Sequence, residues 1–244
     1  MYKTIIHTAT LDNSAIEELN AVIKGELEAA GQYHVLHHKA SVSRSSLSTL
    51  SQALKIDINL LPDGFDPLEI NLLMTDMDST LINIECVDEI ADFAGVKPEV
   101  HAITEAAMRG ELDFAQSLTR RVGLLKGLNQ SVLQEVYDDR LKLNPGADQM
   151  LACLKSKHVK TALVSGGFTF FTDRLQSRLQ LDYSRANVLE IQQGCLMGKV
   201  AGDIVGAEAK RDFLLSLCDE LGINTSSTIA MGDGANDLIM MDKA

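Results

Sequence analysis

The chain has 244 residues and a formal net charge of -12 at pH 7. At roughly 150 residues per domain, this length predicts one or two domains. The negative charge argues against nucleic acid or an anionic membrane as a partner. No apolar run reaches the roughly 18 residues of a transmembrane helix, and the apolar run in the first residues is too short for a signal peptide. The four cysteines are scattered without a C-x-x-C pair, which favours reduced thiols in a cytoplasmic protein.

Residues 1–66 are predicted to form a separate small α/β domain. A long first helix is expected because apolar residues recur at helical spacing up to Leu27. Breaker residues then mark a linker. The expected elements are a strand at Thr4–Thr10, a helix from Asn13 to Gly31, a strand at Tyr33–Val42, a helix at Ser43–Leu54 and a linker at Leu61–Pro67.

In residues 67–244, short apolar strands alternate with helices, which is typical of a doubly wound, Rossmann-like parallel sheet. The expected elements are a strand at Ile70–Met74, a helical insertion at about 83–141, a helix at Ala147–Lys157, a strand at Val159–Val164, a helix ending near Leu179, a hairpin at Val188–Val200, a helix at Gly206–Leu221 and a strand at Ser227–Met231. Open α/β sheets bind ligands at the carboxyl ends of their strands. We therefore expect the helical insertion to lie above that edge as a cap.

Two carboxylates, Asp76 and Asp78, directly follow the first strand of this region. Side chains two residues apart can point the same way into a crevice. A carboxylate can attack phosphorus and form an acyl phosphate. A second carboxyl can protonate the leaving alkoxide and later deprotonate water. Taken alone, the same D-x-D-x-T pattern also fits an ordinary capped loop.

Three later motifs are suited to a phosphate and a metal. The segment Ser165–Gly167 offers backbone N–H groups and a hydroxyl near a helix start. Lys210 stands near a helix start, against the dipole preference, which indicates an anionic partner. Asp233 and Asp237 offer the hard oxygens that suit Mg²⁺. Their structural alternatives are a tight turn, a solvated lysine and a capped glycine-rich turn.

The order of these motifs resembles that of the haloacid dehalogenase (HAD) superfamily of phosphotransferases. Over roughly residues 70 to 244, the chain is more closely similar to the phosphoserine phosphatase family. The stretches that carry this similarity are Asp76–Ile82, Glu85, Asp88–Ala91, Ile103–Met108, Phe114–Leu118, Arg121–Val122, Val164–Phe168 and Gly232–Asp237.

The resemblance implies roles for individual residues. For catalysis it implies Asp76 as nucleophile, Asp78 as acid and base, and Ser165 and Lys210 on the phosphate. For Mg²⁺ it implies Asp76, the backbone carbonyl of Asp78, and Asp233, supported by Asp237. For the substrate it implies Glu85, Arg121, Ser165 and Gly166, with Met108, Phe114 and Asn236 as further contacts.

Arg121 and Glu85 point to the class of substrate. An arginine can grip a carboxylate with two hydrogen bonds, and a glutamate can pair with an ammonium, so together they would bind an amino acid. Without the resemblance, a solvated helix arginine and a helix-start carboxylate would be slightly favoured.

The predicted function is hydrolysis of phosphoserine through an aspartyl-phosphate on Asp76, which the resemblance places at the last step of serine biosynthesis. The alternatives are a phosphatase for another small phosphomonoester, a non-catalytic domain that holds a phospho-aspartate, and a truncated, inactive scaffold. The last arises because the family continues beyond Gly232–Asp237, whereas this sequence stops at Ala244.

The N-terminal domain is expected to be a regulatory, ACT-like module through which the chain could form a homodimer. Its His34, His37 and His38 are interpreted as a partly exposed strand face in preference to a metal site.

Overall fold

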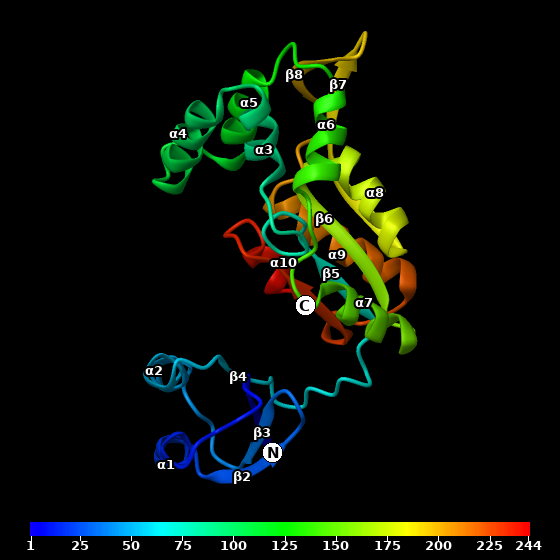
Figure 1. Ribbon diagram of the computed structural model, residues 1–244. Coiled ribbons are helices and arrows are strands. Elements are labelled where there is room, and N and C mark those ends of the chain that lie inside the picture. Colours follow the sequence, from blue (N-terminus) through cyan, green and yellow to red (C-terminus); the bar gives the residue numbers. More distant parts are fainter. The chain divides into compact units, whose positions relative to one another are not determined.

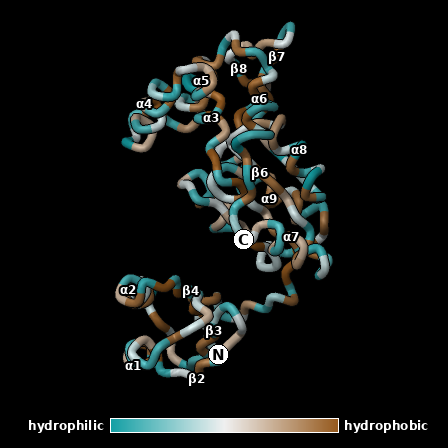
Figure 2. The backbone as a smooth tube through the Cα atoms, in the orientation of Figure 1, coloured by the Kyte–Doolittle hydropathy of each residue, from teal (hydrophilic) through white to brown (hydrophobic).

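The computed structural model describes residues 1–244, which divide into two compact units, Met1–Leu68 and Glu69–Ala244 (Figure 1). Each unit has its own buried hydrophobic residues. Figure 2 shows hydrophobic and hydrophilic residues alternating along the helices, as expected for helices with one buried face. None of the helices is both long enough and apolar enough to cross a membrane.

The N-terminal unit has the β-α-β-β-α-β order of a ferredoxin-like domain. Its elements are β1 (Tyr2–Ile6), α1 (Asn13–Val22), β2 (Gly25–Ala29), β3 (His34–His38), α2 (Arg44–Leu54) and β4 (Ile58–Leu60). The strands form an antiparallel sheet in the order β2-β3-β1-β4. Both helices pack on it through Leu19, Leu47 and Leu50.

The predicted helix from Asn13 to Gly31 is wrong in its second half. Helix α1 ends at Val22, and Gly25–Ala29 forms strand β2, in which Leu27 pairs with Leu36 of β3. Leu27 stands between two glutamates, so its surroundings also fit the two-residue period of an edge strand. Strand β4 was missed because three residues carry too short a pattern.

The boundaries of two other strands were also misplaced: the first strand ends at Ile6, not Thr10, and β3 ends at His38. Helix α2 is confirmed, with the Ser43 side chain accepting a hydrogen bond from the backbone of Ser46 as its N-cap.

The three histidines of β3 do not share one face of the strand. The expectation of a partly exposed face is wrong for His34 and His38, which are buried. His34 contacts the carbonyl oxygen of Thr8 at 2.9 Å, and His38 contacts the hydroxyl of Thr4 at 3.0 Å. His37 projects from the opposite face, where it pairs with Glu28.

The C-terminal unit is built on a five-stranded sheet in the order β8-β7-β6-β5-β9. The parallel strands are β5 (Leu72–Thr75), β6 (Lys160–Phe168), β7 (Tyr183–Gln192) and β9 (Thr228–Met231), with β8 (Cys195–Ala201) antiparallel to β7. Its flanking helices are α7 (Ala147–Ser156), α8 (Thr169–Leu179), α9 (Ala207–Leu221) and α10 (Leu238–Met241), with a 3₁₀ turn η2 (Thr225–Ser227). Helices α7 and α8 pack into one hydrophobic cluster and α9 and α10 into another, so the predicted α/β class is confirmed.

Residues 83–141, which we call the cap, lie between β5 and β6 and contain no strand. The cap comprises α3 (Cys86–Phe93), α4 (Lys97–Met108), α5 (Phe114–Leu124), α6 (Ser131–Glu135) and a π-helix η1 (Val136–Arg140) (Figure 1). Its two connections to the sheet run side by side, joined by a bridge between Ile82 and Leu143. The Asn144 side chain also donates to the carbonyl oxygens of Thr80 and Ile82.

Strand β6 is longer than predicted and includes the Ser165–Gly167 segment. The segment Ser165–Gly167 was expected to form a turn after the strand, but β6 remains extended through it to Phe168. The register of β6 with β7 shifts between Val164 and Phe168, so this stretch interrupts the regular pairing. The irregularity leaves backbone groups of the Ser165–Gly167 segment available to other partners.

Candidate active site

The carboxyl ends of three neighbouring strands converge on one small cavity. Strand β5 leads into Asp76 and Asp78, β9 leads into the Gly232–Asp237 segment, and β6 carries Ser165–Gly167. The cavity measures about 160 Å³, and residues of the cap also line it. Its lining residues are Asp76, Asp78, Glu85, Val87, Phe114, Leu118, Arg121, Ser165, Gly166, Gly167, Asp233, Gly234 and Asn236.

Lys210 is fully buried in the first turn of α9, where it contacts Asp76 of this cavity. Its Nζ lies 2.8 Å from Oδ1 of Asp76 and 2.7 Å from Oδ1 of Asp237. The second oxygen of Asp237 accepts a hydrogen bond from the backbone N–H of Gly234. A buried charge must be paired to be tolerated, so these two carboxylates hold the ammonium group in place.

Asp76 is almost completely buried, and burial raises its pKa to about 6 although the nearby Lys210 opposes the shift. Its Oδ1 lies within ion-pair distance of Lys210 but receives no hydrogen bond of good geometry. A buried carboxylate oxygen in this state has lone pairs free for a cation.

Carboxylate oxygens of Asp76, Asp233 and Asp237 lie within 4.8 Å of one another. Both oxygens of Asp237 are already engaged inside the protein, so it serves better as a support than as a ligand. Asp233 is exposed and contacts only the Thr80 hydroxyl, at 3.3 Å. Asp76 and Asp233 thus remain available, which fits the one or two carboxylates that Mg²⁺ prefers.

Asp78 has a different environment. Burial and the nearby Glu85 raise its pKa to about 7, while the backbone N–H of Cys86, which donates to Oδ1 at 3.1 Å, opposes the rise. A Cβ atom on Gly167 would lie 2.8 Å from Oδ2 of Asp78, so this glycine makes room for the carboxyl. A carboxyl with a pKa near neutrality is suited to acid and base catalysis.

Two cap residues of opposite charge face the same cavity. The Glu85 carboxylate accepts a 2.6 Å hydrogen bond from the Ser79 hydroxyl, and burial raises its pKa. Burial lowers the pKa of Arg121, which forms no salt bridge, and its Nε is buried without a hydrogen-bond partner. Buried hydrogen-bond donors in native structures normally have partners, so Arg121 is suited to bind an acceptor group of a ligand.

Three more of the predicted site residues, Phe114, Asn236 and Ser165, line the cavity. The Ser165 hydroxyl accepts a hydrogen bond from the N–H of Gly167 at 2.8 Å. Met108 is 84 % exposed at the end of α4 and does not line the cavity, so the structure does not bring it to the other site residues.

One buried residue was missed from the sequence. Asn187 on β7 is 1 % exposed; its amide donates to the carbonyl oxygen of Gly166 and accepts from the N–H of Val205, both at 2.8 Å. It therefore ties the Ser165–Gly167 segment to the start of α9. In the sequence, a polar amide directly before the apolar Val188 and Leu189 was the feature that could have drawn attention to Asn187.

The family model of haloacid dehalogenase-like hydrolases matches residues 70–244, and the chain belongs to this family. A phosphoserine phosphatase from Polaromonas sp. is 56 % identical over 192 residues, covering 77 % of this chain and 81 % of the relative. The crystal structure of a probable phosphoserine phosphatase from Vibrio cholerae is 38 % identical and has a TM-score of 0.81, covering 100 % of this chain and 76 % of that one. A substrate-bound phosphoserine phosphatase is 41 % identical with a TM-score of 0.68, over 72 % of this chain and 83 % of that one.

Proposed function

We propose that this protein is a magnesium-dependent phosphatase that hydrolyses phosphoserine to serine and phosphate. The observation that carries the proposal is the shared cavity, in which two aspartates and a buried lysine meet an unpartnered cap arginine. The relatives named phosphoserine phosphatase, at identities up to 56 %, support the same substrate.

In the first half of the reaction, a carboxylate oxygen of Asp76 attacks the phosphorus atom. The ester bond between phosphorus and the serine oxygen breaks, and the protonated Asp78 gives its proton to the leaving alkoxide. The pKa of Asp78, raised to about 7, keeps that proton available near neutral pH. The products of this step are free serine and an aspartyl-phosphate on Asp76.

In the second half, the ionised Asp78 takes a proton from a water molecule that attacks the phosphorus. The bond between phosphorus and Asp76 breaks, and inorganic phosphate leaves with the carboxylate restored. Lys210, fixed by its two aspartates, and N–H groups of the Ser165–Gly167 segment neutralise charge on the transferred group.

Asp76 and Asp233, with the backbone carbonyl of Asp78, would hold Mg²⁺, with Asp237 as support. When bound there, the ion would offset negative charge on the phosphoryl oxygens. The fit rests on the free lone pairs of Asp76 and on the hard-oxygen donor set.

The amino-acid end of the substrate would be bound by the cap. Arg121 offers two parallel N–H donors to the carboxylate, and Glu85 pairs with the ammonium. Ser165 and Gly166 would contact the phosphate, with Phe114 and Asn236 closing the walls.

The test is a phosphate-release assay with phosphoserine, phosphoethanolamine and phosphoglycolate. Asp76→Asn should abolish turnover of every substrate, because an amide cannot attack phosphorus. Arg121→Ala should lower kcat/KM for phosphoserine by a free energy of about 2–5 kcal/mol and leave phosphoethanolamine, which has no carboxylate, nearly unchanged. Glu85→Gln should spare phosphoglycolate, which has no amine.

The matched control is Arg120→Ala, which removes an exposed arginine from the same helix and should change none of the rates. Arg121→Lys should recover only part of the loss, since an ammonium lacks the two-pronged geometry. An Arg121→Ala variant that slows all three substrates by one factor would reject the amino-acid specificity.

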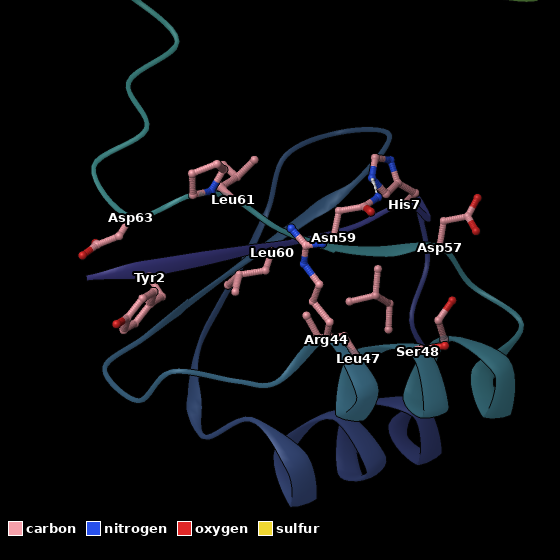
Figure 3. Close-up of a pocket in the computed structure, with 13 residues that line it drawn as sticks. Tyr2, His7, Arg44, Leu47, Ser48, Asp57, Asn59, Leu60, Leu61 and Asp63 are labelled. Atoms are coloured by element: carbon pink, nitrogen blue, oxygen red, sulfur yellow. Dashed lines mark hydrogen bonds between the residues drawn. The ribbon is translucent and has the colours of Figure 1, made fainter. Parts of the chain in front are cut away.

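For the N-terminal unit we propose an ACT-like regulatory module that also supports a homodimer. A hollow of about 800 Å³ lies along β4 and α2, and it carries charges of both signs from Arg44, Asp57 and Asp63 (Figure 3). Arg44 forms no salt bridge or side-chain hydrogen bond, which leaves it free to bind a ligand. Sedimentation of the full chain tests the dimer, and a monomer at micromolar concentration would reject it.

The four cysteines are all free thiols, which supports the cytoplasm as the proposed compartment.

A further inference from the structure

Phe114 makes a contact between the cap and the sheet that its predicted role as a substrate contact does not explain. A Cβ atom on Gly166 would lie 2.6 Å from Cζ of Phe114, and one on Gly206 would lie 3.4 Å from its Cδ1. The ring therefore rests against two glycines from separate segments of the core. Phe114 is the first residue of α5, so the contact joins a cap helix to the core.

Contact with the aromatic ring explains why these two positions are glycines better than their backbone conformation does. Gly206 has φ of -106°, which any residue can adopt, and Gly166 has no positive φ. At Gly166, a side chain is excluded because the aromatic ring occupies its place. At Gly206, an added Cβ would lie in ordinary van der Waals contact with the ring, so an alanine fits, and we expect a larger, branched side chain to displace the ring.

Both glycines belong to segments that surround the phosphate in the proposed reaction. Gly166 lies in the Ser165–Gly167 segment, and the carbonyl oxygen of Gly206 accepts from the backbone N–H of Lys210 at 3.0 Å. Asn187 joins the same two segments by hydrogen bonds to Gly166 and Val205. The ring can therefore contact both glycines only when the two segments have this arrangement.

The cap presents the ring from a fixed helix start. The Asp113 side chain accepts from the N–H of Gln116 at 2.7 Å, and the Gln116 side chain accepts from the N–H of Asp113 at 3.4 Å. Such a capping box fixes the first turn, including Phe114. Arg121 follows two turns later on the same helix, so a shift of α5 would move both side chains.

We propose that Phe114, Gly166 and Gly206 form a latch that holds the cap closed on the assembled phosphate site, and that Gly206 thereby determines specificity for substrates bound by the cap. The latch places Arg121, which lies on the same helix as Phe114, over the cavity. Substrates that need Arg121 depend on the latch, whereas a phosphomonoester without an amino-acid end does not. The inference rests on the proposed function only for its choice of substrate.

The test variant is Gly206→Val, which puts a branched side chain under the ring. We expect kcat/KM for phosphoserine to fall by about 10–100-fold, as for a misplacement of roughly 1 Å at an active site. The rate with p-nitrophenyl phosphate should change less than threefold. Gly206→Ala should stay within threefold of the wild type for both substrates. The matched control, Gly123→Val, changes a cap glycine with no atom within 4 Å of the added Cβ and should have no effect on either.

A double variant separates the latch from general damage. Phe114→Ala removes the ring, so adding Gly206→Val to it should cause no further loss. Equal losses in both backgrounds would overturn the proposal, as would a Gly206→Val protein that keeps its phosphoserine rate. If Gly206→Val alone does not fold, the double variant must fold, and failure of both would also reject the latch.

Hydrogen exchange provides a readout without turnover. In Gly206→Val, the peptide covering 114–124 should exchange faster than in the wild type, and in Gly123→Val it should not. Peptides covering 165–168 and 203–210, which form the proposed phosphate site and are joined by Asn187, should exchange as in the wild type. This measurement holds even if phosphoserine is not the substrate, so failure of the latch and failure of the proposed function are distinguishable. Unchanged exchange of the 114–124 peptide would overturn the latch.

Discussion

The raised pKa of Asp78 predicts that this residue, the proposed catalytic acid, destabilises the fold when it is ionised. Its pKa rises from 3.8 to about 7, so holding the ionised form in the folded protein costs about 4 kcal/mol. Asp78→Asn removes this charge and keeps an oxygen that can accept from the N–H of Cys86. The new amide N–H groups need partners that the site does not all provide, so we expect a net gain of about 1–3 kcal/mol in unfolding free energy above pH 7.

The pH dependence of that gain has a definite sign. An unfolded aspartate ionises near pH 3.9, so below that pH both states are protonated and the substitution changes little. As the pH rises towards 7, the unfolded wild type ionises freely while the folded form resists, and wild-type stability falls. The advantage of Asp78→Asn should therefore be near zero at pH 4 and complete at pH 8.

Urea unfolding, followed by circular dichroism at pH 4, 6 and 8 with chelator present, measures this difference. The chain contains no tryptophan, and its two units should be fitted as separate transitions. Asp173→Asn, on the outer side of α8, is the control for loss of an exposed carboxylate. An Asp78→Asn advantage that is absent, or equal at pH 4 and pH 8, would refute the reasoning, and turnover should fall about 10²–10⁴-fold in the same variant.

Two further predictions concern residues outside the cavity. Asn187→Leu should raise both the KM for phosphoserine and the inhibition constant for inorganic phosphate about tenfold. The reason is that the Gly166 carbonyl and the Val205 N–H lose their hydrogen-bond partner. An unchanged inhibition constant would contradict the positioning role of Asn187. Burial alone would raise the pKa of Asp182, but hydrogen bonds from Lys160 and Thr161 outweigh it and lower the pKa. Asp182→Asn should therefore cost about 1 kcal/mol at pH 7, and urea unfolding should show the cost disappearing as the pH falls below the ordinary aspartate range.

The sequence located the acidic motifs because they directly follow continuous apolar runs. Strand β5 buries all four of its residues, whereas in β9 only Thr228 is buried and the other three residues are partly exposed. Both runs are apolar in the sequence, so Asp76 and Asp233 are expected where each strand ends. The parallel arrangement followed from the helices between the runs. The α/β class could therefore be predicted because the local sequence pattern of the strands agrees with the way the strands are connected.

Other features depend on contacts that no local pattern carries. Strand β2 exists because Leu27 meets Leu36, and that pairing outweighs the helical spacing of the residues before it. The two hydrogen bonds of Asn187 link residues 21 and 18 positions away in the chain. The position of Met108 away from the cavity depends on how α4 ends, which the resemblance did not reveal.

The charge of the site predicts that metal and phosphate bind together. Five carboxylates and two cationic side chains lie in or beside the cavity: Asp76, Asp78, Glu85, Asp233, Asp237, Lys210 and Arg121. One oxygen of Asp237 pairs with the ammonium of Lys210, and the other accepts a hydrogen bond from the N–H of Gly234. A phosphate dianion that enters the cavity would therefore meet mostly negative charge.

A bound divalent cation would reverse this charge balance and strengthen phosphate binding. Thermodynamic linkage then requires that bound phosphate increase the affinity for the metal by the same factor. We expect inorganic phosphate to bind about 5–150-fold more tightly with saturating Mg²⁺ than with chelator, measured by titration calorimetry. The reciprocal titration of Mg²⁺, with and without phosphate, should give the same ratio. In Asp233→Ala the ratio should shrink towards one, because the variant loses a carboxylate free to hold the ion. Phosphate affinity that is independent of Mg²⁺ in the wild type would show that Lys210 and the Ser165–Gly167 segment suffice to bind the anion, and the metal would then lose its proposed place in the reaction.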